Sequence, residues 1–126
     1  MPFTPGRPIA EAKADLFKAM AHPGRVRILE LLAAGERTIG ELATGTGMEL
    51  SHLSQQVTVL RRAGVVDSRR VRNTVVCSLR DPQTAELLAV ARRLLTRTLQ
   101  DDQELLVALA QADDAIALAD PARTPT

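Results

Sequence analysis

The sequence has few of the residues from which proteins build disulfides, metal sites and aromatic binding surfaces. Its 126 residues include one cysteine, two histidines and two phenylalanines, with no tryptophan and no tyrosine. A lone thiol cannot form an internal disulfide, which indicates a reducing compartment. Transition-metal sites use three or four ligands, mostly thiolates and imidazoles. We therefore expect no metal site and no other cofactor.

Long apolar runs and catalytic motifs are also missing. No segment approaches the roughly 18 apolar residues of a membrane span, and the N-terminus lacks the basic-then-apolar pattern of a secretion signal. No nucleophile with a neighbouring base, phosphate-binding glycine loop or metal cluster is recognisable, which argues against an enzyme. With 45% hydrophobic residues, we expect a cytoplasmic protein with one modest core and no membrane partner.

The net charge of +1 conceals an uneven distribution of charged residues along the chain. Residues 51–80 hold six arginines against one aspartate, residues 1–50 are balanced, and residues 81–126 have an acidic excess. Fourteen of the 16 basic residues are arginine, whose flat guanidinium matches phosphates and guanine edges. The middle window therefore indicates contact with a nucleic acid.

Hydrophobic periodicity and turn residues predict a mainly α domain with a small β-hairpin. Before the hairpin we expect four helices: Ile9–Met20, a second from Pro23 to about Gly35, a short third from Thr38 to the glycines at 45 and 47, and Leu50–Arg62. Thr38 stands three residues before Glu41, which is the spacing of a capping box. His22, just before Pro23, is expected to cap or to pack.

β-Branched residues on either side of Arg72 and Asn73 predict a two-stranded hairpin over about residues 65–80. Asp81 and Pro82 then predict the start of a further helix. We expect a flexible arm over 1–8, the folded domain over 9–119 and a flexible tail over 120–126.

The helix Leu50–Arg62 has an unusual polar face. Its apolar stripe is expected to consist of Leu50, Leu53, Val57 and Leu60. The remaining positions carry hydroxyls and amides instead of the Glu and Lys that usually cover a surface helix. Hydroxyls and amides bond base edges and phosphates, and an acid there would repel the duplex.

A short helix, a glycine turn, a polar-faced helix and a basic hairpin together predict a winged helix-turn-helix. Double-stranded DNA is then the expected partner. The expected DNA-binding residues are Ser51, His52, Ser54, Gln55, Gln56, Thr58 and Arg62 of the helix, with Arg69, Arg70, Arg72 and Asn73 of the hairpin.

The helical sequence after Pro82 has more apolar residues than a one-sided helix needs, including Leu94, Leu95 and Leu99. A short C-terminal helix could cover the surplus. The surplus could also pair with its copy and with the first helix across a two-fold axis, which is the interpretation we favour. We therefore expect a homodimer through the first and last helices.

The segments "AHPGRVRIL" and "LSQQVTVLRRAGVV", with the hairpin, resemble the ArsR/SmtB family of bacterial winged-helix repressors. The resemblance runs from about Leu16 to Leu99, and "ELLAVARRLL" resembles the last helix of actinobacterial members. It implies a homodimer that binds an inverted-repeat operator and leaves it when an effector binds. It also implies base contacts by Ser51, Ser54 and Gln55. The family more often has His at the position of Gln56.

Metal-sensing members of that family often carry a Cys pair in the short helix, or Asp, His and Glu ligands on the last helix. The corresponding "TIGELAT" here has no Cys, and residues 80–111 have no His. We therefore expect a metal-independent regulator, with an unidentified small-molecule effector as one possible control.

Two alternatives stay open at this point. Cys77 alternates with Val75 and Leu79 on one strand face, so it either fills the core or makes a thiol-responsive, redox-sensing repressor. The whole domain could also be a winged-helix module that binds an acidic protein partner. A shortage of aromatic anchors argues against that module.

Overall fold

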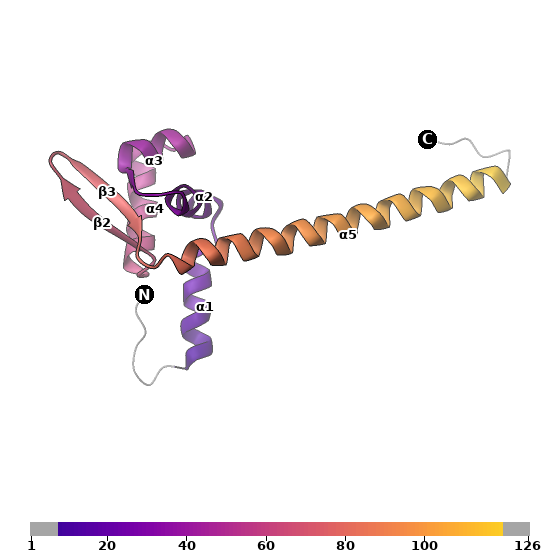
Figure 1. Cartoon of the computed structure of the whole chain (residues 1–126), viewed down its shortest axis with the longest axis horizontal. Helices are drawn as coiled ribbons and strands as arrows, with labels where there is room; N and C mark the ends of the chain where they lie inside the picture. Colours follow the sequence, from indigo (N-terminus) through magenta and orange to yellow (C-terminus); the bar gives the residue numbers. More distant parts are fainter. Residues whose placement is uncertain (1–7, 120–126) are drawn as a thin grey trace. The chain divides into compact units, whose positions relative to one another are not determined.

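The structure, a computed structural model, describes residues 8–119, with side chains as far as Gln111. In chain order its elements are α1 (Ile9–Met20), α2 (Pro23–Ala33), β1 (Arg37–Thr38), α3 (Ile39–Thr46), α4 (Leu50–Arg62), β2 (Val66–Val71), β3 (Thr74–Leu79) and α5 (Gln83–Ala119) (Figure 1). The chain divides into two compact units between Leu88 and Ala89. The expected tail, and the expected arm except for Pro8, lie outside the described residues.

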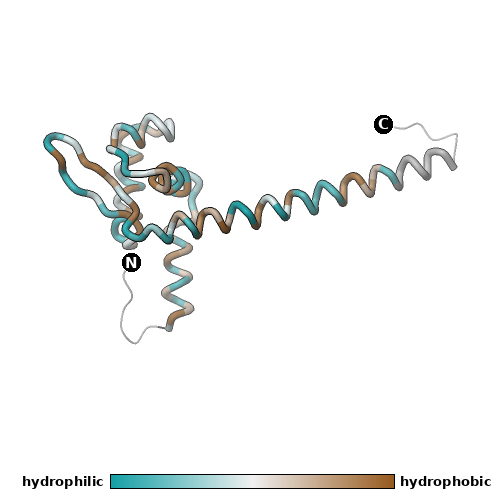
Figure 2. The backbone as a smooth tube through the Cα atoms, viewed as in Figure 1, coloured by the Kyte–Doolittle hydropathy of each residue, from teal (hydrophilic) through white to brown (hydrophobic). Residues whose placement is uncertain are grey.

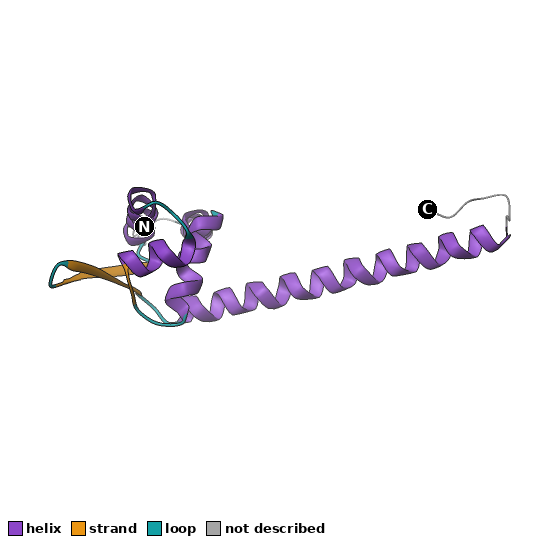
Figure 3. Ribbon diagram, turned by 90° about the horizontal axis from the view of Figure 1, so that it is seen from above, coloured by secondary structure: helices purple, strands orange, loops and turns teal. Residues whose placement is uncertain are grey.

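The N-terminal unit is a helix-turn-helix followed by a hairpin, as the sequence predicts (Figures 1 and 3). Its core is formed by α2, α3 and α4 with the base of the hairpin. The buried apolar residues are Met20, Ile28, Leu29, Leu32, Leu42, Leu53, Val57, Leu60, Val65, Val66 and Cys77. No helix within residues 8–119 has both the length and the apolar character needed to cross a bilayer.

Local hydrogen bonds explain where the first helices begin. His22 Nδ1 accepts from Gly24 N at 3.0 Å and Pro23 opens α2, which confirms the capping role of His22. Thr38 Oγ1 accepts from Glu41 N at 3.1 Å, and Glu41 Oε1 accepts from Thr38 N at 3.0 Å. This is the predicted capping box, and it fixes the start of α3.

A left-handed glycine makes the turn from α3 to α4. Gly47 has φ +73°, and its N–H donates to Ala43 O at 2.9 Å. Gly45, which we expected to break the helix, lies inside α3. The buried hydroxyl of Thr46 donates to Leu42 O at 2.7 Å and accepts from Met48 N at 3.3 Å. The left-handed conformation of Gly47 and the hydrogen bonds of the buried Thr46 side chain therefore fix the turn.

The sheet contains a short strand that the sequence analysis missed. Its strand order is β1-β3-β2, and both pairs are antiparallel. β1 pairs Arg37 with Cys77 and Thr38 with Val76. The hairpin itself pairs Val66 with Leu79 and turns at the predicted tip, where Arg72 has φ +58°. The hairpin of β2 and β3, which forms the wing, is thus joined to the start of α3 through β1.

The last helix differs from one of the two interpretations of the sequence. α5 runs without a break for 37 residues, so no separate short helix follows it within residues 83–119. Asp81 Oδ1 accepts from Gln83 N at 2.9 Å and caps the helix start, directly after Pro82. Leu87 and Leu88 pack against the core of the N-terminal unit.

We predict that Gly47→Ala lowers the free energy of unfolding by about 1–2 kcal/mol, because a side chain disfavours the left-handed conformation. The added Cβ itself would meet no atom within 4 Å, so backbone strain is the whole expected effect. Urea unfolding followed by circular dichroism measures the change. Gly40→Ala in α3 is the matched control, and it should leave stability unchanged or raise it by up to about 1 kcal/mol. Equal effects of the two substitutions would contradict the assignment of the turn.

Candidate nucleic-acid interface

α4 separates its apolar and polar residues onto two faces. Leu53, Val57 and Leu60 are buried at 0%, 4% and 0% exposure. Leu50, expected in the same stripe, is 57% exposed, because at the first position of α4 it extends past the edge of the core. The buried stripe is therefore shorter than predicted, and the N-terminal turn of α4 is open to solvent.

Four of the predicted DNA-binding residues of α4 form one open surface. The side chains of Ser51, His52, Ser54 and Gln55 are all exposed. Arg62 is also exposed, at the opposite end of the helix. No acidic residue lies within α4, whose sequence is LSHLSQQVTVLRR. The surface therefore offers hydrogen-bond donors and acceptors without negative charge.

The two remaining predicted residues of α4 are engaged within the protein. Thr58 Oγ1 donates to Ser54 O at 2.8 Å, along the helix. Gln56 is half-buried, and its Oε1 accepts from Arg25 Nη1 at 2.9 Å. Arg25 Nε also donates to Ala19 O at 2.6 Å. Arg25 therefore links the end of α1, α2 and α4, and Gln56 is the residue by which it holds α4.

The wing arginines divide into engaged and available groups. Arg61 Nη1 donates to Ser68 Oγ at 3.3 Å, and Arg80 Nε lies 3.1 Å from Asp67 Oδ1. Among residues 51–80, three exposed arginines have no ion pair or hydrogen-bond partner: Arg62, Arg70 and Arg72. Asn73 at the tip is exposed as well. Within this window, the available positive charge therefore lies at the end of α4 and near the tip of the hairpin.

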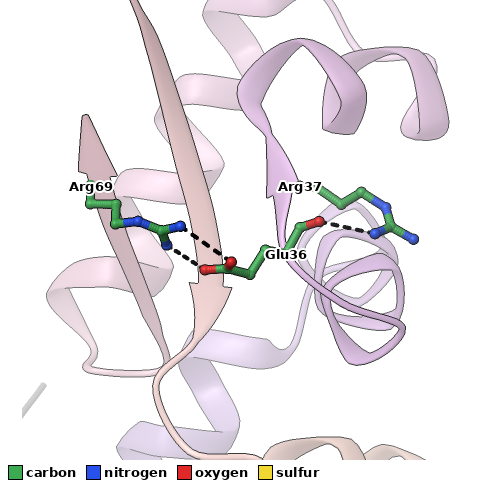
Figure 4. Close-up of polar contacts among 3 residues, drawn as sticks. All are labelled: Glu36, Arg37 and Arg69. Carbon is green, nitrogen blue, oxygen red and sulfur yellow. Dashed lines mark hydrogen bonds and ion pairs between the residues drawn. The ribbon is translucent and has the colours of Figure 1, made fainter. Parts of the chain in front are cut away.

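Arg69 is held by an acidic side chain from outside the hairpin. Its guanidinium binds the carboxylate of Glu36 through both terminal nitrogens, with Arg69 Nη2 at 3.2 Å from Glu36 Oε1 (Figure 4). The hydrogen bond and charge of Arg69 lower the pKa of Glu36. Glu36 directly precedes β1, so this pair reaches across β3 to β2. The pair thus holds β2 of the wing to the segment that precedes β1.

Cys77 lies on β3 at the centre of the sheet. It is fully buried and pairs in register with Arg37 on one side and Ser68 on the other. Burial raises the pKa of the Cys77 thiol, an effect that the charge of Arg61 partly opposes. A neutral, covered thiol is a poor nucleophile and a poor metal ligand. These observations support the core-filling interpretation of Cys77.

Across the described residues, no three His, Cys, Asp or Glu side chains lie close enough together to hold a metal ion. His22 is engaged at the start of α2, and His52 lies exposed on α4. The arrangement therefore presents a polar and cationic surface, and its chemistry is hydrogen bonding and charge neutralisation.

Sequence reasoning missed the supporting residue Glu36, and it left the role of Arg25 open between an ion pair and a phosphate contact. Arg25 is a charged residue on an otherwise apolar helix, and such a position in the sequence indicates a side chain that is buried or that bridges two elements. Glu36 gave no signal, because its contact with Arg69 spans 33 residues.

The chain is similar to known proteins in both its sequence and its fold. Residues 22–68 match the family described as "Bacterial regulatory protein, arsR family". The chain is 54% identical over 95 residues to the HTH-type transcriptional regulator Rv0081 of Mycobacterium tuberculosis, covering 75% of this chain and 83% of that protein. The crystal structure of Rv0081 matches with a TM-score of 0.71 at 52% identity, covering 77% of this chain and 98% of that chain.

Two further solved structures have a similar fold. The solution structure of the homodimeric winged helix-turn-helix DNA-binding domain of Mb0332 from Mycobacterium bovis has a TM-score of 0.68 at 29% identity, covering 78% of this chain and 95% of that one. The transcriptional repressor BigR from Xylella fastidiosa has a TM-score of 0.64 at 33% identity, covering 68% and 87%. The predicted winged helix-turn-helix fold is confirmed.

We predict that Cys77 of the folded protein reacts with a disulfide reagent at least about tenfold more slowly than a free thiol at pH 8, because reaction requires an exposed thiolate. Labelling in native buffer and in urea, followed by absorbance, measures both rates. A cysteine placed at exposed Ser54, in a Cys77→Ala background, is the control and should react fast. Rapid labelling of Cys77 in the native protein would instead favour the thiol-sensing alternative.

Proposed function

The chain belongs to the ArsR family of bacterial regulatory proteins and is a DNA-binding transcriptional regulator, and we propose that it acts as a homodimeric repressor on an inverted-repeat operator. In each subunit α4 would enter a major groove, and the two α4 helices would lie about one helical turn apart. The wing would contact the neighbouring phosphates or minor groove. We further propose that it acts in the cytoplasm, where bacterial DNA lies.

One observation carries this proposal: the acid-free polar face of α4 lies in the same unit as three available arginines. Ser51, Ser54 and Gln55 offer short side chains that can reach base edges. Arg62, Arg70 and Arg72 offer charge for phosphates at the margins of that surface. His52 at the start of α4 and Asn73 at the wing tip are also exposed, and we propose them as further contacts. We propose that Gln56 and Thr58 are positioning residues, because both side chains form hydrogen bonds within the protein.

Exposed apolar side chains support the homodimer. On α1, Ile9, Leu16 and Phe17 are 57%, 38% and 54% exposed. α5 exposes a further set: Val90, Leu94, Leu95, Leu99, Leu105, Leu106, Val107 and Leu109. Helices with this much open apolar surface usually bury it in an interface. A homodimeric relative with the same fold points the same way.

We propose no catalytic role and no metal effector. DNA release would then follow from a small molecule or from the cellular level of the protein.

We predict that Gln55→Ala weakens binding to the specific operator by about 1–3 kcal/mol and binding to random duplex much less, because an amide reads base edges. Fluorescence anisotropy on both DNAs at one salt concentration measures the difference. Gln103→Ala, the same change on the exposed surface of α5, is the control and should leave both affinities unchanged. Equal losses on both DNAs would show that Gln55 contacts only the backbone.

We also predict that Arg72→Ala weakens binding to all duplexes similarly and lowers the slope of log K against log salt by about one unit, because one phosphate contact is lost. Titrations at four salt concentrations give the slope. Arg97→Ala removes an equal charge from α5 and should not change it. A wing that stays off the duplex would leave the slope of the Arg72 variant unchanged.

A further inference from the structure

A groove between α1, α2 and α4 lies within the N-terminal unit, away from the polar face of α4 that is proposed to read DNA bases. Its volume is about 330 Å³, which is at the lower end of the range for sites of small molecules. Three bases and one acid line it: Lys18 and Asp15 of α1, Arg25 of α2 and Arg62 of α4. This α1–α4 groove therefore has a surplus of positive charge, which favours an anion.

The three cations of the groove keep donors open to a ligand. Arg25 donates from Nε to Ala19 O at 2.6 Å and from Nη1 to Gln56 Oε1 at 2.9 Å, and its Nη2 has no partner among the described residues. Because none of those residues has a buried side-chain nitrogen without a partner, Nη2 is open to solvent. The side chains of Lys18 and Arg62 are exposed, and within residues 8–111 neither has an ion pair or a hydrogen bond. The two bonds of Arg25 hold its guanidinium in place, so its free nitrogen is pre-organised for a ligand.

The rest of the groove is apolar. Ala19, Val59 and Ala63 complete its lining, and Val59 is 39% exposed. A bare phosphate ion would leave these side chains in water, whereas a carboxylate with a short hydrocarbon chain would cover them. The groove therefore suits a small amphipathic carboxylate.

A homodimer through the exposed apolar residues of α1 would leave the groove open. Hydrophilic and hydrophobic residues alternate along α1 (Figure 2). Since 3.6 residues make one helical turn, Lys18 lies on the opposite side of α1 from Ile9 and Leu16. The dimer and a ligand can therefore use different sides of the same helix.

We propose that the α1–α4 groove is a regulatory site for a small amphipathic carboxylate, which binds Lys18, Arg25 Nη2 and Arg62 and covers Val59 with its hydrocarbon chain. The proposal rests on the proposed function, in which Arg62 also contacts DNA phosphate. A bound carboxylate neutralises Arg62 and withdraws it from the duplex. Ligand and DNA then weaken each other's binding by the same factor.

Binding is tested on the full-length protein without DNA, with hexanoate as the probe. Hexanoate should bind saturably with a millimolar dissociation constant, as expected for a ligand of so few atoms. Hexanol has the same chain without the charge, and acetate has the charge without the chain, so both should bind much more weakly. An NMR titration measures each constant, and the amide shifts caused by hexanoate should lie in α1, α2 and α4.

The two lysines of α1 provide a matched pair of variants. Lys18→Gln should weaken hexanoate binding about threefold or more, because one charge contact is lost. Lys13→Gln makes the same change at an exposed position away from the groove and should bind like wild type. Val59→Glu places an acid in the groove and should weaken binding at least about tenfold. Circular dichroism confirms that each variant is folded.

Two results of these titrations would overturn the site. One is hexanoate binding that does not saturate, and the other is equal binding to the Lys18 and Lys13 variants.

Regulation is tested by fluorescence anisotropy on the operator, with hexanoate replacing chloride at constant ionic strength. Saturating hexanoate should raise the dissociation constant of the operator about fivefold or more. It should also lower the slope of log K against log salt by about one unit, because one phosphate contact is lost. Arg62→Ala should lower the slope equally and remove the effect of hexanoate.

The outcomes separate this inference from the proposed function. Operator affinity that stays unchanged when hexanoate fills the groove overturns the regulatory role even if operator binding is intact. A protein that binds hexanoate in the groove but shows no preference for an operator sinks the proposed function and leaves the carboxylate site in place.

Discussion

The burial of one face of α4 is the constraint on which the rest of the N-terminal unit depends. Leu53, Val57 and Leu60 enter the core at helical spacing, and this fixes the rotation of α4 about its axis. Every other side chain of the helix is then placed by geometry alone. Gln55 points outward because Leu53 and Val57 point inward. The same helical period therefore places the apolar side chains of α4 in the core and its polar side chains on the surface.

The positive charge of residues 51–80 serves two purposes in this structure. Arg61 and Arg69 hold the wing to its surroundings through Ser68 and Glu36, and Arg80 links the two ends of the hairpin through Asp67. The arginines at the wing tip and at the end of α4 keep their charge open. Both groups lie within residues 51–80, so the number of charges in the sequence points to this region but does not distinguish the arginines that hold the wing from those that stay available.

Local features were predictable from the sequence because they depend on neighbouring residues. The capping box of Thr38 and Glu41, the extent of α4 and the hairpin tip at Arg72 all follow from spacings of a few residues. β1 was missed because two residues show no periodicity. The Arg25–Gln56 and Glu36–Arg69 contacts, 31 and 33 residues apart, require the tertiary structure. The alternative of a separate C-terminal helix was wrong because α5 continues through the acidic residues near 101.

Residues 36–38 connect three parts of the unit within three positions. Glu36 binds Arg69 of β2, Arg37 and Thr38 pair with β3, and Thr38 caps α3. The wing and the helix-turn-helix are thereby braced as one rigid body, and the span between them is set by the protein. In the proposed complex, a duplex that contacts both would have to match that span. Base pairs that the protein never touches would then affect affinity through their stiffness, so sequence preference would extend into flanking DNA as indirect readout.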